Sequence, residues 1–235
     1  MVKMLKKLNQ PGFRFEYSDH STIKIRKKYK KIDKITCKEF YWQFITKNLT
    51  RPTACNKWEE LYFYINFNWK HILQLPYFTA SETCLQSIQY QIINRFFPCN
   101  SVVHQWYAEF DPLCASCHIE DTIEHYFFNC NKASVFWSNF KLWWRDTTQC
   151  LIKLGALDIV FGIMNENNND LLWILNFCIL FSKYYIHNCK LQNKPCDFNH
   201  FVHKLKNRIE TEQYIATVNG KLDAFVKKWD VLLNI

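Results

Sequence analysis

Residues 114–130 read CASCHIEDTIEHYFFNC and hold three cysteines and one histidine within 17 positions. Cys114 and Cys117 are separated by two residues, so both sulfur atoms can point at one centre from a single tight turn. His125 and Cys130 add a nitrogen and a third sulfur, which completes the tetrahedral ligand set that zinc prefers. Because the protein would fill all four positions, we expect a structural zinc site that organises the fold.

The spacing between His125 and Cys130 poses a geometric problem. Five residues of an ideal α-helix turn through about 500°, so the two side chains would lie roughly 140° apart. Asp121 is the expected N-cap of a short helix that carries His125. This helix must therefore loosen before Cys130, and Asn129 and Asn131 are residues that tolerate such an ending.

Two alternatives to this site remain open. His118 directly follows Cys117 and could replace His125 as the ligand. The cysteines and histidine could also form a reduced cluster in a core that holds no metal. Most of the other cysteines lie in apolar or helical contexts, where a buried thiol packs as a small hydrophobic group.

The composition favours a helical, well-packed protein. The chain has 235 residues, only 4 glycines and 6 prolines, and an aromatic content of 17%. Few helix breakers and many large apolar side chains predict an all-α fold, with packed helices around the small zinc-binding turn. The segment 149–162 is ambiguous between helix and strand, and Thr79–Glu82 is a predicted capping box. Periodic apolar residues predict helices over 35–46, 53–72, 85–96, 101–110, 132–145, 171–191, 197–217 and 222–233.

The eleven cysteines and the lack of a secretory signal point to a reducing compartment. Polar residues follow the first lysines, where a signal peptide would have an apolar stretch. The longest apolar run, Leu171–Phe181, is interrupted by Asn176 and is shorter than the ~18 residues of a membrane span. We therefore expect an intracellular protein of the cytoplasm or nucleus, with no membrane partner.

Positive charge is concentrated at the N-terminus. Residues 1–38 contain 12 Lys and Arg against 3 Asp and Glu, whereas residues 39–235 contain 18 of each kind. We expect a poorly ordered basic arm over residues 1–34 and a helical region over 35–235, with the zinc-binding segment at 111–145.

Clustered basic residues neutralise phosphates, and aromatic rings can stack on bases, so the arm is a candidate nucleic-acid contact. A solvated tail or a localisation signal is the competing interpretation. A second, smaller basic cluster lies on one face of the helix predicted over 197–217. The candidate nucleic-acid-binding residues are Lys24, Arg26, Lys27, Lys28, Tyr29, Lys30 and Lys31 in the arm and Lys204, Lys206 and Arg208 in that helix.

The cysteine–histidine segment and its flanks resemble the zinc-binding region near the C-terminus of LINE-type (non-LTR) retrotransposon reverse transcriptase polyproteins. The resemblance covers about residues 35–235. One departure is the segment 126–129, Tyr-Phe-Phe-Asn, where the family commonly has Leu-Phe-Trp-Glu. The landmarks, in order, are Lys57-Trp58-Glu59, Asn68–Ile72, Gln89–Arg95, Asp121–His125, Phe136-Trp137, Phe161-Gly162 and Lys228-Trp229.

The resemblance implies a module that binds RNA or single-stranded DNA beside a reverse transcriptase core. The chain itself lacks the paired aspartates that hold the polymerase metals, and it has no room for fingers and palm. Ser18-Asp19-His20 resembles the closing tripeptide of the element's endonuclease, but the other nuclease motifs are missing. We therefore expect a protein that is not an enzyme by itself. A scaffold fragment that once packed on the polymerase and a non-functional transposon remnant are the alternatives.

Overall fold

The computed structural model describes residues 22–25, 28–48, 50–163 and 170–233, with the backbone alone for 23–25 and 44–48. The chain forms two compact units, Met1–Arg51 and Pro52–Ile235. Composition had predicted a boundary after residue 34, so the first unit extends beyond the basic arm and includes a helix.

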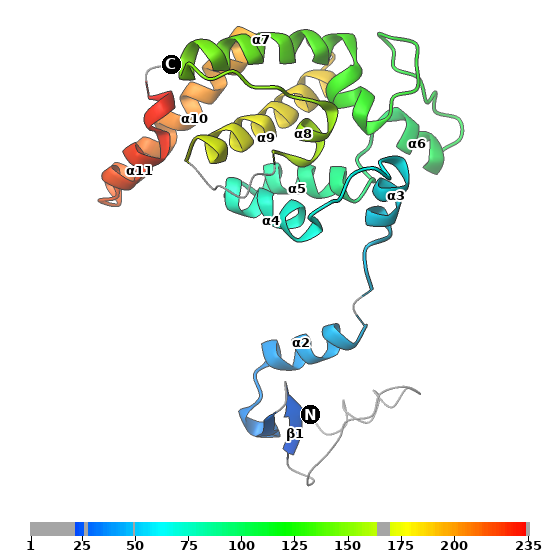
Figure 1. Cartoon of the computed structure of the whole chain (residues 1–235), viewed down its shortest axis with the longest axis vertical. Helices are drawn as coiled ribbons and strands as arrows, with labels where there is room; N and C mark the ends of the chain where they lie inside the picture. The colour runs from blue at the N-terminus through cyan, green and yellow to red at the C-terminus, as the bar shows by residue number, and fades with distance from the viewer. Residues whose placement is uncertain (1–21, 26–27, 49, 164–169, 234–235) are drawn as a thin grey trace. The chain divides into compact units, whose positions relative to one another are not determined.

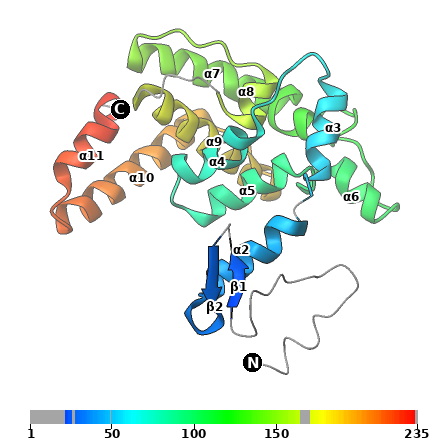
Figure 2. The same cartoon turned by 60° about the horizontal axis from the view of Figure 1, so that its bottom comes forward.

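The first unit contains a β-hairpin that the sequence did not predict (Figure 2). Strand β1 (Thr22–Ile25) pairs antiparallel with β2 (Lys28–Lys31), in a register that places Lys24 opposite Tyr29. A 3₁₀-helix (Ile32–Lys34) leads to α2 (Cys37–Asn48). A capping box opens α2: Glu39 N–H donates to Thr36 Oγ1 at 3.2 Å, and Thr36 N–H donates to Glu39 Oε2 at 3.1 Å.

The second unit is built from helices, which confirms the predicted all-α class (Figure 1). In the part of the chain that the structure describes, no helix has the length and apolar character to cross a membrane. Its elements are α3 (Thr53–Leu61), α4 (Trp69–Thr79), α5 (Thr83–Ile93), α6 (Asn100–Trp106), a π-helix (His125–Asn129), α7 (Asn131–Thr148), α8 (Ala156–Phe161), α9 (Asp170–Leu191), α10 (Phe198–Val218), α11 (Leu222–Trp229) and a 3₁₀-helix (Asp230–Leu232).

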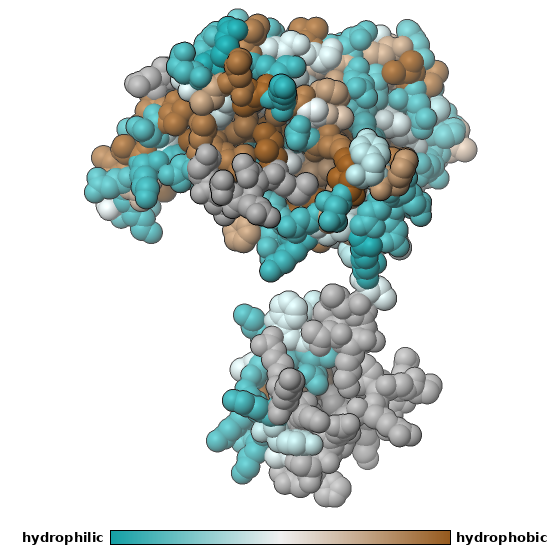
Figure 3. Space-filling model, viewed as in Figure 1, coloured by the Kyte–Doolittle hydropathy of each residue, from teal (hydrophilic) through white to brown (hydrophobic). Residues whose placement is uncertain are grey.

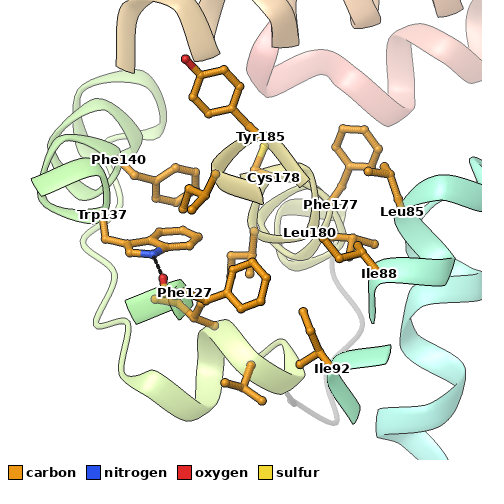
Figure 4. Close-up of a cluster of buried hydrophobic side chains, with 14 of the residues drawn as sticks. Leu85, Ile88, Ile92, Phe127, Trp137, Phe140, Phe177, Cys178, Leu180 and Tyr185 are labelled. Carbon is orange, nitrogen blue, oxygen red and sulfur yellow. Dashed lines mark hydrogen bonds between the residues drawn. The ribbon is translucent and has the colours of Figure 1, made fainter. Parts of the chain in front are cut away.

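Helix α9 forms the centre of this unit. Every residue from Ile174 to Leu180 is buried, as expected for a helix that is apolar all round. Figure 4 shows α5 side chains on one side of α9, and Phe127 together with Trp137 and Phe140 of α7 on the other. The predicted helix over 171–191 is confirmed, and its apolar run is a core helix.

Asn176, which interrupts that apolar run, clamps a neighbouring loop. Its side-chain oxygen accepts from Ile163 N–H at 2.7 Å, and its amide donates to Ile163 O at 3.0 Å. Gly162 allows this approach because it has a φ of +86° and a Cβ there would lie 2.4 Å from Leu75 Cδ2. The interruption therefore satisfies the backbone of the segment that follows α8.

Three local predictions were wrong or incomplete. The helix predicted over 53–72 is two helices, because the chain turns after Leu61 and Asn68 caps α4 by accepting from His71 N–H at 3.2 Å. The capping box at Thr79–Glu82 does not form, since Glu82 pairs instead with Arg208 of α10. The ambiguous segment 149–162 contains α8, which starts where Gly155 N–H donates to Asp158 Oδ2 at 2.8 Å.

The other helices confirm their predictions to within a few residues. α10 begins as expected after Asp197, whose carboxylate accepts from Asn199 N–H at 2.8 Å. α7 starts directly after Cys130 and presents Phe136, Trp137 and Phe140 to the core. This places the last predicted metal ligand at the junction between the π-helix and a well-packed helix.

Candidate metal centre

The structure brings Cys114, Cys117, His125 and Cys130 together. Their ligand atoms all lie within 4.8 Å of one another, and the Sγ atoms of Cys117 and Cys130 are 3.9 Å apart. A tetrahedral site with Zn–S bonds of 2.3 Å has sulfur–sulfur edges of about 3.8 Å. The group could therefore hold a metal ion with little rearrangement.

The turn at Cys114–Cys117 explains why His118 is not one of the four candidate ligands. His118 N–H donates to Cys114 O at 2.8 Å, and Cys114 N–H donates to Ile119 O at 2.8 Å, so the chain folds back tightly after Cys117. His118 occupies the left-handed region with a φ of 55°, and its side chain is exposed. The structure thus favours His125 as the fourth ligand and gives His118 the role of a turn residue.

The π-helix solves the geometric problem between His125 and Cys130. Cys130 N–H donates to His125 O at 2.8 Å, a bond across five residues in place of four. The wider turn reduces the angle between these two residues, and Cys130 then leaves the helix with extended dihedrals. The predicted loosening before Cys130 is confirmed.

A π-helix displaces backbone carbonyls from the usual hydrogen-bond pattern, and two neighbouring helices satisfy them here. Trp137 Nε1 of α7 donates to Phe127 O at 2.6 Å, the contact drawn in Figure 4. Lys190 Nζ of α9 donates to Tyr126 O at 2.7 Å and also lies 3.8 Å from the centre of the Tyr126 ring. The core helices therefore hold the ligand-bearing turn in its unusual shape.

Asp121 does not have the predicted capping role. His125 N–H donates to Thr122 Oγ1 at 3.1 Å, so Thr122 is the residue that caps this turn. The Asp121 carboxylate is buried instead, with Oδ1 3.8 Å from His125 Nε2, and burial raises its pKa. A carboxylate beside a metal-binding imidazole is a common orienting partner.

The His125 ring has the properties expected of a metal ligand. Both ring nitrogens are buried, and neither has a hydrogen-bond partner among the described residues. Buried polar atoms are almost always paired, so this arrangement is informative. Burial lowers the pKa of His125, although Asp121 opposes the shift, and the neutral form is the one that binds metals.

The surroundings of Cys130 favour negative sulfur. Burial alone would raise the pKa of the Cys130 thiol. The Lys190 ammonium and the N–H groups of Lys132 and Ala133 lower it by more, so the net shift of the pKa is downward. Asn131 N–H donates to Cys117 Sγ at 3.4 Å and lowers the pKa of that thiol, but burial and the neighbouring Cys130 and Cys114 raise it, so the net shift for Cys117 is upward. The thiolate is the form that binds metals, and the first turn of a helix stabilises it.

No protein-family model matches the chain, and a search of curated proteins gives no match.

The predicted nucleic-acid-binding residues differ in exposure and in ion pairing. Lys28 and Lys31 are exposed, Tyr29 is half-exposed, and Lys30 pairs with Glu39. Arg26 and Lys27 lie outside the described residues, and Lys24 is described by its backbone alone. Lys204 and Lys206 are exposed on α10, whereas Arg208 is half-buried and bonded to Glu82 and Glu212. Arg208 therefore links helices within the unit.

The centre also involves Asp121 and Lys190, which were not predicted there from the sequence. Asp121 precedes His125 by four residues, a spacing that places two residues on one helical face and could have been noticed. Lys190 is 64 residues away from Tyr126 in the chain, and no local pattern connects them.

Two histidine variants should separate the ligand from the turn residue. We expect His118→Gly to retain the metal, because glycine favours the left-handed conformation that His118 adopts. We expect His125→Ala to lose most of it. Metal content of the purified reduced proteins, measured by inductively coupled plasma mass spectrometry, checks both results. Loss of metal in His118→Gly with retention in His125→Ala would reverse the assignment.

Proposed function

We propose that the chain is a non-catalytic zinc-binding module that binds RNA or single-stranded DNA through its basic N-terminal unit. The observation that carries this proposal is the distribution of charge between the compact units. Met1–Arg51 contains 14 Lys and Arg against 4 Asp and Glu, whereas Pro52–Ile235 contains 16 against 17. Long-range attraction to phosphates therefore comes from the first unit.

Zinc is the metal proposed for the centre. Three thiolates and one imidazole in a tetrahedral set suit zinc, and softer sulfur ligands disfavour magnesium and calcium. With all four positions supplied by the protein, the ion would be structural. It would hold the turn at Cys114–Cys117 against the start of α7.

Strand β2 is the proposed phosphate and base contact. Successive side chains of a strand point to opposite faces, so Tyr29 and Lys31 share one face. Lys28 lies on the other face at the end of the strand, where the nucleic acid would meet it on passing the edge of the hairpin. A ring beside a cation matches the pairing of stacking and phosphate contacts in single-stranded nucleic-acid sites. Lys204 and Lys206 on the charge-balanced unit are secondary candidates.

The sequence resemblance supports the association with a reverse transcriptase. It covers the landmarks between residues 57 and 229, and in that family such a module follows the polymerase that supplies the catalytic aspartates. The proposed partners are therefore RNA or single-stranded DNA and a reverse transcriptase core, and the module positions nucleic acid without reacting with it.

Matched charge reversals test the location of binding. We expect Lys28→Glu/Lys31→Glu to weaken oligouridine binding by at least tenfold. Two lost phosphate contacts should also reduce the slope of log affinity against log salt by about 1.4. The control Lys204→Glu/Lys206→Glu makes the same charge change in the other unit and should have a much smaller effect. Fluorescence anisotropy over a salt series provides the measurement, and equal effects of the two pairs would contradict the proposal.

An apolar surface favours a second candidate function, that of a protein-interaction module. On the face of the Pro52–Ile235 unit shown in Figure 3, hydrophobic residues gather around the middle and hydrophilic residues surround them. Surfaces of this kind commonly contact other proteins. If the oligouridine experiment shows no binding, this candidate becomes the preferred one.

A further inference from the structure

Exposed aromatic side chains lie in the segment of the chain that leads to the metal centre. Trp106, Tyr107 and Phe110 are 54%, 55% and 54% exposed, and Leu113 and Ile119 add 39% and 52%. They extend from the end of α6 to the turn that follows Cys117. We call these five residues the aromatic face.

The backbone holds the aromatic face together. Phe110 N–H donates to Tyr107 O at 3.1 Å, and the two rings lie 6.0 Å apart. His104 Nδ1 lies 2.6 Å from Phe110 O, which ties the loop back to α6. An isolated antiparallel bridge then joins Leu113 to Glu120, next to Ile119. The face is therefore a built feature of the loop that presents Cys114.

The aromatic face exposes more apolar surface than a single side chain would. A single exposed apolar residue needs no explanation, but three rings within five positions each expose about half of their surface. Half of the 150–250 Å² of each ring amounts to roughly 300 Å² in total, which is the size of patch that often marks an interaction site. Aromatic residues are also enriched at the centres of protein interfaces.

The segment that carries the aromatic face is negatively charged. Residues 96–131 contain five Asp and Glu and no Lys or Arg. Asp121 is buried and Glu124 lies 3.7 Å from Arg95, whereas Glu109, Asp111 and Glu120 are exposed. A phosphate backbone would be repelled here, although the rings alone would suit stacking on bases.

We propose that the aromatic face docks a Lys- and Arg-rich segment of a protein partner. The three rings offer apolar contact and cation–π interactions, and the exposed carboxylates offer ion pairs to the same cations. The proposal goes beyond the proposed function, because it gives the metal-bearing unit a protein partner and leaves nucleic acid to the basic unit.

A peptide titration tests the docking surface on the full, zinc-loaded chain. The probe is a synthetic peptide that repeats Lys-Leu-Arg, compared with a Glu-Leu-Glu repeat of equal length and with oligouridine. Calorimetry provides the affinity, and fluorine NMR of 5-fluorotryptophan protein provides a signal at Trp106. We expect the basic peptide to bind and shift the Trp106 resonance, and the acidic peptide and oligouridine to leave that resonance unchanged.

Variants with matched controls locate the binding. We expect the affinity for the basic peptide to fall by about tenfold or more in Trp106→Ala and in Glu109→Lys/Glu120→Lys, as at the centre of an interface. The exposed control pair on α10, Tyr214→Ala and Glu210→Lys, should change its affinity less than twofold. Metal content should stay the same in all variants, which verifies that the centre is intact.

Three results would overturn the proposal. They are the absence of basic-peptide binding, an equal loss in the control variants, and a shift of the Trp106 resonance by oligouridine. The last result would assign the face to nucleic acid. None of these three results depends on Lys28 or Lys31, which test the proposed function. The experiments can therefore contradict the docking surface without contradicting the proposed function, and the reverse.

Discussion

Replacement of Cys130 by Ser is expected to reduce the metal content from about one ion per chain to none and to destabilise the Pro52–Ile235 unit. Cys130 is 1% exposed and stands at the start of α7, directly before the core residues Phe136 and Trp137. A ligand present at a thousand times its Kd stabilises a protein by about 4 kcal/mol, and the variant would lose a contribution of that size. Thermal unfolding by circular dichroism, with metal analysis, provides the measurement.

Cys84→Ser is the matched control for this variant. Cys84 lies exposed on α5 and outside the cluster of ligands, so the same chemical change should leave metal content and melting temperature unaltered. A strong chelator should lower the melting temperature of the wild type and of Cys84→Ser, but not that of Cys130→Ser. Full metal retention in Cys130→Ser would exclude the centre described here.

Lys183 should give the protein an unusual pH dependence of stability. It lies in α9 and is 2% exposed; its ammonium donates to Gln89 Oε1 and, at 3.2 Å, to Val160 O. A cavity of about 10 Å³ beside it has room for no more than one water molecule. Burial lowers the pKa of Lys183 to about 7, so this lysine is largely neutral in the folded protein above that pH.

The sign of the effect follows from proton binding. Between pH 7 and the ordinary lysine pKa near 10.5, the unfolded chain binds a proton that the folded chain does not. The free energy of unfolding therefore rises with pH, and the contribution of Lys183 between pH 7 and 9 is roughly 2 kcal/mol. Lys183→Met should lack this increase, because its side chain does not titrate.

Urea unfolding at pH 7, 8 and 9 of the wild type, Lys183→Met and the exposed control Lys153→Met provides the measurement. Thiols also titrate in this range, so the informative quantity is the difference between proteins at each pH. We expect the free energy of unfolding to rise with pH by the same amount in the wild type and in Lys153→Met. In Lys183→Met it should rise less, so the difference from the other two proteins should grow with pH. Parallel curves for all three proteins would show that Lys183 is not titrating as described.

The features that were predictable from sequence are those with short-range or periodic signals. The ligand set Cys114, Cys117, His125 and Cys130 lies within one segment, and α9 is apolar over several turns. Even the need for a loosened helix before Cys130 followed from its five-residue distance to His125. These signals act within one element, so one sequence suffices to read them.

The remaining features depend on partners distant in the chain. The sequence predicted Glu82 as part of a capping box. Its carboxylate instead forms an ion pair with Arg208, which lies 126 residues away in the chain. Trp58 Nε1 of α3 donates to Ile93 O at 2.8 Å, a contact that no pattern within residues 53–72 reveals. Tertiary contacts of this kind override local propensity.

The π-helix before Cys130 is equivalent to one extra residue inserted into an α-helix. Without that residue, His125 and the cysteine would stand four positions apart, about 40° from alignment on an ordinary helix. The chain thus keeps the same ligands at a longer spacing by widening a single turn. Searches for related centres should accordingly accept both spacings, and shortening the segment by Asn129 would convert one arrangement into the other.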